Sequence, residues 1–178
     1  MGAGIDALVT SIGNYGLPTA GLPRVHPQFP GVQIEWFYNQ YPYFEDENNL
    51  SLVLHLTVHG YSFLFPGDME RAGFENIFAT APRFRTVVGG LNVLMASHHG
   101  RVNGVCPSMF DDWGCSPNLV VVSDDYKQYA SQETVNYYAS KCSGIKDFRT
   151  LGNTRKVLTT RNDGPIVFTF ANGNCFAS

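Results

Sequence analysis

Two short polar segments, each at the end of a hydrophobic run, carry residue types that could bind a metal ion. The first is Gly67-Asp68, which follows "FLFP", and the second is His98-His99-Gly100, which follows "VLMAS". A carboxylate oxygen and an imidazole nitrogen are both good zinc ligands, and a carboxylate can bridge two ions. The glycines allow sharp backbone turns beside such a site. These residues indicate a divalent metal site shared by Asp68 and the histidines.

Each of these residues also has an ordinary structural interpretation. Asp68 precedes an amphipathic stretch, so its side chain could cap the N-terminus of a helix. Either histidine of the pair could be a polar loop residue. His55 and His59 suit structural positions, on the polar face of a strand and in a turn, and His26, in "RVHPQ", lies in a proline-containing loop and is a weaker ligand candidate. The metal interpretation requires both polar segments to meet on one edge of a sheet.

A predicted β-hairpin leads into the first polar segment. "SLVLHLTV", residues 51–58, alternates with period two, which predicts a half-buried strand with Leu52, Leu54 and Leu56 on its buried face. The dipeptide "HG" that follows suits a tight turn, and "YSFLF" is its partner strand. The hairpin would deliver Asp68 to the end of its second strand.

Further strands and helices are expected on both sides of this hairpin. The expected strands are "VQIEWFY" (32–38), "LNVLMAS" (91–97) and "NLVVVS" (118–123). The expected helices are "MERAGFENIFA" (69–79) and "SQETVNYYASKC" (131–142), and Ser131 would cap the second of them. A last pair of strands, "KVLTT" and "PIVFTF", is expected on either side of the turn "RNDG". This mixture predicts an α/β or α+β protein with a mixed sheet and flanking helices.

The composition limits the classes of partner. With 12 basic and 15 acidic residues the net charge is −3, so no general electrostatic attraction to nucleic acid or anionic membranes is expected. A nucleic-acid substrate would have to be held by a local site. No signal peptide and no apolar run of about 20 residues is present, which favours a cytoplasmic location by default.

The length and the cysteines bear on domain organisation. A chain of 178 residues suits one domain over 1–178, with a loop-rich, proline-containing N-terminal segment over 1–30. Cys106, Cys115, Cys142 and Cys175 form no CxxC pair, which argues against a structural zinc knuckle. Two disulfides and four free thiols both remain open.

The ordered set of motifs resembles the C-terminal half of a metallo-β-lactamase-fold hydrolase, of the type found in ComEC-like DNA-uptake proteins. The matching segments are "ENNLSLVLHLTVHGYSFLFPGDME", "LNVLMASHHG", "NLVVVS" and "VLTTRNDGPIVFTF", in the family's order over roughly residues 48 to 170. The resemblance implies an αββα sandwich, of which 31–178 would form mainly the C-terminal half. It also implies that Asp68 bridges two metal ions and that His98 or His99 binds one. His98 is favoured because it follows its strand directly.

The family's signature, His-x-His-x-Asp-His in the N-terminal half of the fold, is absent from this sequence. The chain would supply only part of the ligand set, so zinc or manganese is expected to bind weakly or not at all. The first hypothesis is a fragment or subunit of a metal-dependent hydrolase that cleaves a phosphodiester or another ester with metal-activated water. In it Asp68 holds the metal, His98 is a ligand, and His99 is a further ligand or contacts the substrate.

The second hypothesis is a non-catalytic, degenerate module of the same family that acts in protein interaction or self-association. Under both hypotheses a second chain or a second copy would complete the fold and cover an exposed sheet face. The isolated chain is expected to be inactive without the missing half.

Overall fold

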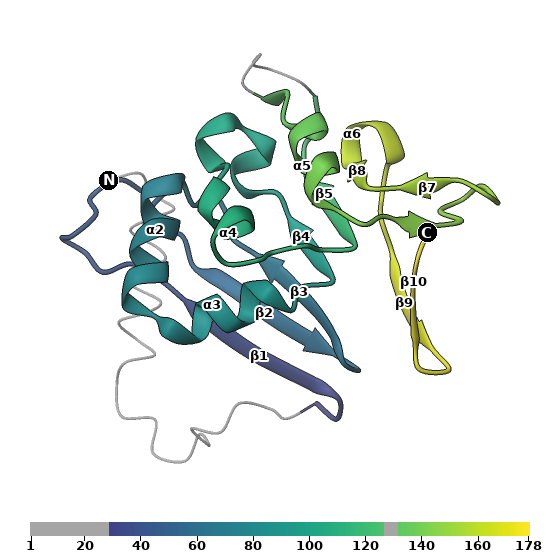
Figure 1. Ribbon diagram of the computed structural model, residues 1–178, viewed down its shortest axis with the longest axis horizontal. Helices are drawn as coiled ribbons and strands as arrows, with labels where there is room; N and C mark the ends of the chain where they lie inside the picture. The colour runs from purple at the N-terminus through teal and green to yellow at the C-terminus, as the bar shows by residue number, and fades with distance from the viewer. Residues whose placement is uncertain (1–28, 127–131) are drawn as a thin grey trace, which may run out of the picture. The chain divides into compact units, whose positions relative to one another are not determined.

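The structure is a computed structural model that describes residues 29–126 and 132–178, of which Gly31–Ser178 form one compact unit. Its centre is a six-stranded sheet with the order β1-β2-β3-β4-β5-β8 (Figure 1). The strands are β1 (Val32–Phe37), β2 (Val53–Val58), β3 (Tyr61–Phe65), β4 (Val93–Met95), β5 (Leu119–Val122) and β8 (Val157–Thr159). The first three strands pair antiparallel, and β3, β4, β5 and β8 pair parallel. The predicted mixed sheet is confirmed.

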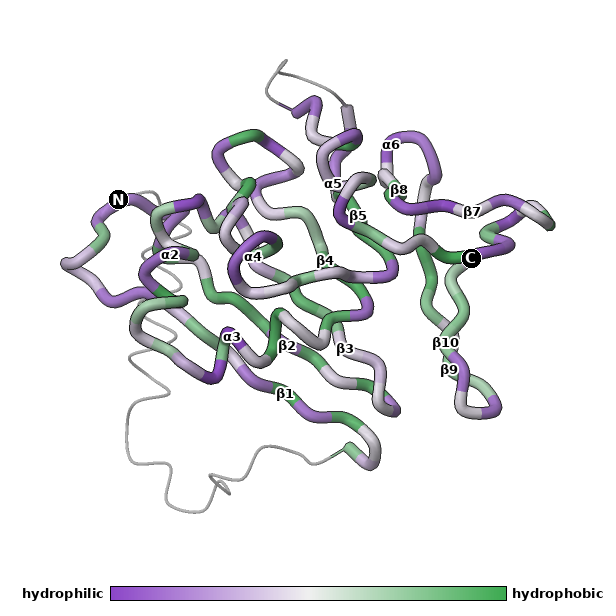
Figure 2. Tube along the Cα trace, viewed as in Figure 1, coloured by the Kyte–Doolittle hydropathy of each residue, from purple (hydrophilic) through white to green (hydrophobic). Residues whose placement is uncertain are grey.

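Helices cover one face of this sheet. They are α2 (Arg71–Thr80), α3 (Pro82–Gly89), α4 (Pro107–Asp111) and α5 (Val135–Lys141). Phe74 and Phe84, from α2 and α3, are almost fully buried in a core that also contains Val53, Leu64 and Val120 of the sheet. Figure 2 shows that hydrophobic residues concentrate in the strands, as the apolar runs in the sequence indicated.

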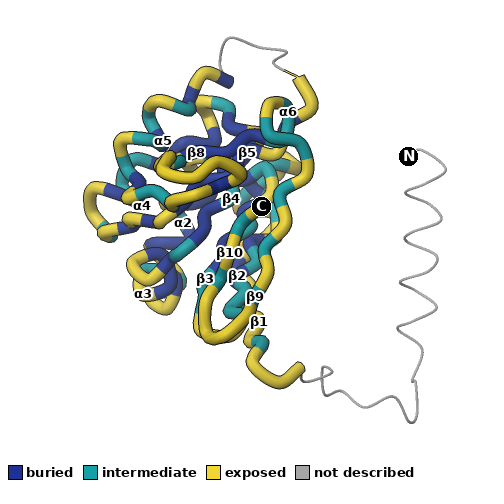
Figure 3. Tube along the Cα trace, turned by 90° about the vertical axis from the view of Figure 1, so that its right-hand side faces the viewer, coloured by how far each residue is buried: buried dark blue, intermediate teal, exposed yellow. Residues whose placement is uncertain are grey.

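Among the described residues, the opposite face is covered in part by a hairpin of β9 (Phe168–Ala171) and β10 (Asn174–Ala177), and in part by Phe148, Ile145 and Ile166. In Figure 3 this hairpin lies on the other side of the sheet from α3 and α4. Its side chains pack with Phe63, Val93 and Leu119 in a second, smaller core. A further short pair, β6 (Ile145–Lys146) and β7 (Thr154–Arg155), lies outside the main sheet.

The predicted hairpin of β2 and β3 is confirmed, but the prediction of its buried face is wrong. Leu54 pairs with Phe65 across the hairpin, as expected. Leu52, however, is 57% exposed and both other leucines are only half-buried, whereas Val53 and His55 are buried at 0% and 7% exposure. The reason is that the helices pack on the face that carries Val53 and His55.

The C-terminal strands are also paired differently from the prediction. β8 joins the main sheet beside β5, and β9 pairs with β10, so "KVLTT" and "PIVFTF" do not form a hairpin. "RNDG" lies in and just after the short helix α6 (Thr160–Asp163), where Thr159 Oγ1 accepts a hydrogen bond from the Asn162 N–H. The predicted break between two elements is therefore correct, but the segment forms a short helix after β8 rather than the turn of a hairpin.

Several smaller expectations can be compared with the structure. The second predicted helix is α5, with Thr134 at its N-cap; Ser131 and His26 lie outside the described residues. All four cysteines are free thiols, which answers the disulfide question. Within the described part of the chain, none of the helices has the length and apolar character that crossing a membrane requires.

Candidate functional site

The candidate site lies at the edge of the sheet where the parallel strands end. Asp68 follows β3, and His98 and His99 follow β4 in the 3₁₀ turn η1 (Ser97–Gly100). Ser97 Oγ donates to the Gly67 carbonyl at 3.1 Å, and the His98 N–H donates to the same carbonyl at 3.0 Å. These bonds hold the two polar segments side by side, which confirms that they meet on one edge.

Asp68 and His99 face each other at this edge. His99 Nε2 lies 3.5 Å from Asp68 Oδ1, and the side chains are 53% and 44% exposed. The expectation that Asp68 converges with at least one of the two histidines is confirmed. Asp68 does not cap a helix, because α2 begins after Glu70 and no side chain caps its first turn. Its carboxylate is therefore open to solvent at a sheet edge.

The other ring nitrogen of His99 determines what the first one can do. His99 Nδ1 lies 2.8 Å from the Ser123 carbonyl oxygen, at the end of β5. A carbonyl only accepts hydrogen bonds, so Nδ1 carries the proton. In the neutral ring Nε2 then holds a lone pair that faces the carboxylate of Asp68. Two electron-rich atoms face each other, and either a proton or a cation between them would satisfy both.

The separation of these two atoms matches that of two ligands on one metal ion. Zinc bonds to histidine nitrogen and carboxylate oxygen are about 2.0–2.2 Å long, and a tetrahedral ion places two such ligands roughly 3.4 Å apart. Metal-binding histidines commonly donate their second ring N–H to a backbone carbonyl, as His99 does to Ser123. Asp68 and His99 thus have suitable geometry for two ligands of one divalent ion.

His98 has different partners from those expected for a ligand beside Asp68. Its side chain is 8% exposed, and its Nδ1 faces Glu70 Oε1 at 3.4 Å. Its Nε2 lies 3.1 Å from an Arg101 guanidinium nitrogen. Glu70 is in turn held by amide groups of Asn48 and Asn103, at 3.0 and 2.6 Å. His98 is thus placed within a polar network behind the rim, and it is His99 that the structure pairs with Asp68.

The backbone of the histidine turn adopts an unusual conformation. His98, His99 and Gly100 have φ values of +50°, +54° and +72°. Left-handed backbone costs a residue with a side chain roughly 1–2 kcal/mol, and such strain concentrates at functional sites. At Gly100 an added Cβ would lie 2.9 Å from a Val122 methyl group, so only glycine fits. All three residues of His-His-Gly therefore adopt left-handed backbone, and Gly100 is the position at which a side chain would clash.

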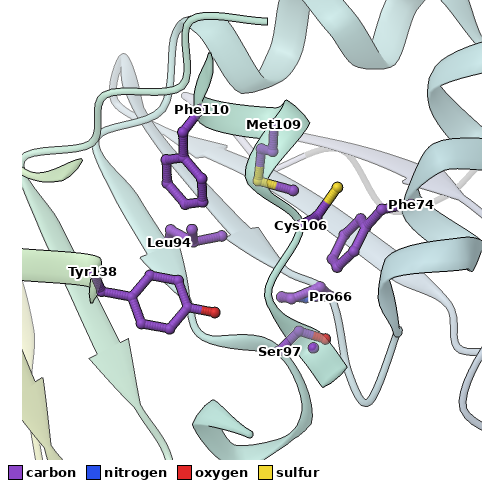
Figure 4. A pocket seen from close by; sticks show the side chains of 9 residues that line it. Pro66, Phe74, Leu94, Ser97, Cys106, Met109, Phe110 and Tyr138 are labelled. Carbon is purple, nitrogen blue, oxygen red and sulfur yellow. The ribbon is translucent and has the colours of Figure 1, made fainter. Parts of the chain in front are cut away.

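The cavity behind the rim is too small for a substrate. A small space of about 10 Å³ lies behind the rim, and several of the side chains that line it are shown in Figure 4. Its lining residues are Pro66, Phe74, Leu94, Ser97, Gly104, Cys106, Met109, Phe110 and Tyr138. This volume holds about one water molecule. Burial raises the pKa of the Cys106 thiol, so it is not an activated nucleophile. Any substrate of this site would have to bind on the exposed rim.

Sequence reasoning missed several residues that build this edge. The Ser123 carbonyl orients His99, and Asp124, which follows it, forms a buried ion pair with Arg161 beyond β8. The signal was available, because "VVVSD" ends a strand in an acid much as "FLFPGD" does. Its ion pair with Arg161 makes Asp124 a residue that holds β5 to α6.

The remaining histidines of the described residues lie elsewhere. His55 is buried in the main sheet, where its Nε2 lies 2.8 Å from Ser62 Oγ, and His59 is exposed in the β2–β3 turn. Over residues 29–126 and 132–178 there is no group of three or more histidine, cysteine, aspartate or glutamate residues that could hold a metal ion. Asp68 and His99 therefore fit a metal as two ligands of an incomplete set.

The comparisons with known proteins assign no family. No protein-family model matches the chain, and a search of curated proteins finds no match.

Proposed function

We propose that this chain contributes part of the site of a metal-dependent hydrolase of the metallo-β-lactamase type. The observation that carries the proposal is the pair at the sheet edge: His99 Nε2 and Asp68 Oδ1 are 3.5 Å apart, while Ser123 holds the other ring nitrogen. The sheet with helices on one face and an incompletely covered opposite face agrees with the C-terminal half of an αββα sandwich.

The division of roles follows from the contacts. Asp68 and His99 would hold a zinc or manganese ion, and Ser123 would orient the histidine ring. Such an ion, when bound, lowers the pKa of its water toward neutrality and polarises the scissile group. His98, Glu70 and Arg101 would support the turn from behind. The reaction would be hydrolysis of a phosphodiester or another ester, with the remaining metal ligands supplied by a second polypeptide.

A second candidate function is a non-catalytic interaction module of the same type. It is favoured by one observation, that the described residues contain no group of three metal-binding side chains. In that case His99 and Asp68 would form an ordinary ion pair at the rim, with the histidine protonated.

Calorimetric zinc titration of the full chain, with turnover of bis-p-nitrophenyl phosphate, tests the proposal. Few ligands mean weak affinity, so we expect weak zinc binding, no turnover by the isolated chain, and loss of the remaining binding in Asp68→Asn and His99→Gln. The matched controls Asp112→Asn and His59→Gln change exposed residues elsewhere and should bind zinc as the wild type does.

Two outcomes would contradict this view. Zinc binding that is unchanged in both rim variants would remove Asp68 and His99 as ligands and leave the non-catalytic module. Tight stoichiometric binding with turnover would mean that the chain holds a complete site.

A further inference from the structure

The outer strands of the main sheet have a polarity opposite to that expected from their surroundings. On β1 and β2, the side chains that point toward the helix-covered face include two polar cross-strand pairs. These are Gln33 with Thr57 and Glu35 with His55. The side chains of the other face are Val32, Ile34, Trp36, Leu54, Leu56 and Val58, all of them apolar. Apart from the paired residues Phe37 and Val53, which are buried in the core under the helices, these two strands direct their apolar residues away from the helices.

The described residues that cover this apolar face lie over part of it. Phe168 and Phe170 of the β9–β10 hairpin pack on Phe63, with ring centroids 5.1 and 6.1 Å apart, and Tyr61 Oη donates to the Gly173 carbonyl. This cover reaches β3 and Leu56 of β2, which packs against the same core. Beyond it, Ile34 is 49% and Trp36 48% exposed.

The exposed area is large enough for a protein interface. Fully covered aromatic residues contribute about 150–250 Å² each, so half-exposed Trp36 and Ile34 with part-exposed Leu54, Leu56 and Phe65 leave on the order of 400 Å² of apolar surface. Homodimer interface cores are about 65% apolar, which corresponds to roughly 600 Å² per partner. The total of about 1,200 Å² reaches the lower limit of stable interfaces.

We propose that the face of β1, β2 and β3 formed by Ile34, Trp36, Leu54, Leu56 and Phe65 binds the same face of a second copy of this chain. An isologous dimer brings identical surfaces together, which like charges would oppose. The side chains on this face of these strands carry no charge, so two copies can meet without repulsion. Sheets that pack face to face lie about 10 Å apart, with interdigitating apolar side chains, and this face supplies them.

Sedimentation velocity of the full chain from about 1 to 100 µM tests the dimer across the affinity range of modest interfaces. We expect a concentration-dependent monomer–dimer equilibrium. Ile34→Lys and Leu56→Lys, which change directly paired residues, should raise the dissociation constant by more than about tenfold, as for a core interface residue. Gln33→Lys adds the same charge to the next residue of β1, on the opposite face, and should leave it unchanged.

A milder variant guards against misfolding of the lysine variants. Ile34→Thr keeps a β-branched side chain suited to a strand and should weaken the dimer in the same direction. Four outcomes would each overturn the proposal. The wild type could stay monomeric, or the dimer could be equally stable in all Ile34 and Leu56 variants. Gln33→Lys could weaken the dimer as much as the other lysine variants do, or the chain could form open-ended larger species.

Discussion

Two histidine–carboxylate pairs of almost equal length occupy very different surroundings. His55 Nδ1 lies 3.4 Å from Glu35 Oε2 on the helix-covered face of the sheet, and His99 Nε2 lies 3.5 Å from Asp68 Oδ1 at its edge. The side chain of His55 is 9% exposed and that of His99 is 53% exposed. Residue types and distance alone do not separate these pairs.

The difference lies in what holds each ring. His55 lies in a regular strand, and its second nitrogen contacts the Ser62 hydroxyl, which can donate or accept. His99 lies in left-handed backbone, and its second nitrogen is held by a carbonyl, which can only accept. A ring nitrogen held by a carbonyl, greater exposure and left-handed backbone distinguish the edge pair, which is the one that we propose to hold a metal ion. The inner pair is part of the packing.

Replacing each histidine with alanine should give the largest contrast. His55→Ala removes a buried ring with its contacts to Glu35 and Ser62, and we expect a loss of about 2–3 kcal/mol in unfolding free energy. His99→Ala, at an exposed position, should change it by less than about 0.5 kcal/mol. Urea unfolding of both variants measures this difference. Equal losses would mean that the edge pair is as structural as the inner one.

Acidification should affect the inner pair in a direction that its pKa shift determines. Burial lowers the pKa of His55, against the raising influence of Glu35. Below the unfolded-state pKa of about 6.5, the unfolded chain therefore takes up a proton more readily than the folded chain. The free energy of unfolding consequently decreases as the pH is lowered. We expect a lower unfolding free energy at pH 5.5 than at pH 7.5, with a smaller difference in His55→Gln.

The inner pair would lose this role if the variant kept the full pH dependence. The pKa of Glu35 is lowered, chiefly by its hydrogen bond from Arg83. Its stabilising contribution is lost only as the pH falls below its ordinary value of about 4.5, so it does not confuse the interval tested.

The strands of the sheet and the meeting of Asp68 with a histidine could be predicted from the sequence. Both follow from hydrophobic runs that end in polar residues, since neighbouring parallel strands end at one edge. The choice between His98 and His99 could not be predicted. It depends on consecutive left-handed residues and on the carbonyl of Ser123, which directly follows β5 and lies 24 residues further along the chain than His99.

The buried face of β2 shows a second limit. Alternation in "SLVLHLTV" separates the two faces correctly but does not say which one the helices cover. The alternation predicts burial of Leu52, Leu54 and Leu56, whereas the helices cover Val53 and His55. What covers a sheet face is decided by the whole chain, or by a partner, and not by the strand itself.

Glycine at the edge histidine should separate strain from side-chain contacts. His99→Gly relieves left-handed backbone worth roughly 1–2 kcal/mol, offset in part by about 0.5–1 kcal/mol from the freer unfolded chain. We expect it to be more stable than His99→Ala by about 0.5 kcal/mol, in thermal unfolding at matched pH. An alanine variant that is the more stable of the two would show that the turn is not strained.

The smallest effect should come from the ion pair between Arg83 and Glu35, the carboxylate partner of His55. Arg83 lies 3.0 Å from Glu35, and its side chain is 59% exposed. Exposed pairs contribute about 0.2–1 kcal/mol and are screened by salt. A double-mutant cycle of Arg83→Gln and Glu35→Gln should therefore give a coupling below about 0.5 kcal/mol at low salt and less at high salt. A larger, salt-insensitive coupling would mean that Arg83, rather than burial, holds the Glu35–His55 pair in place, and the two histidine pairs would then differ less in their electrostatics than in their exposure.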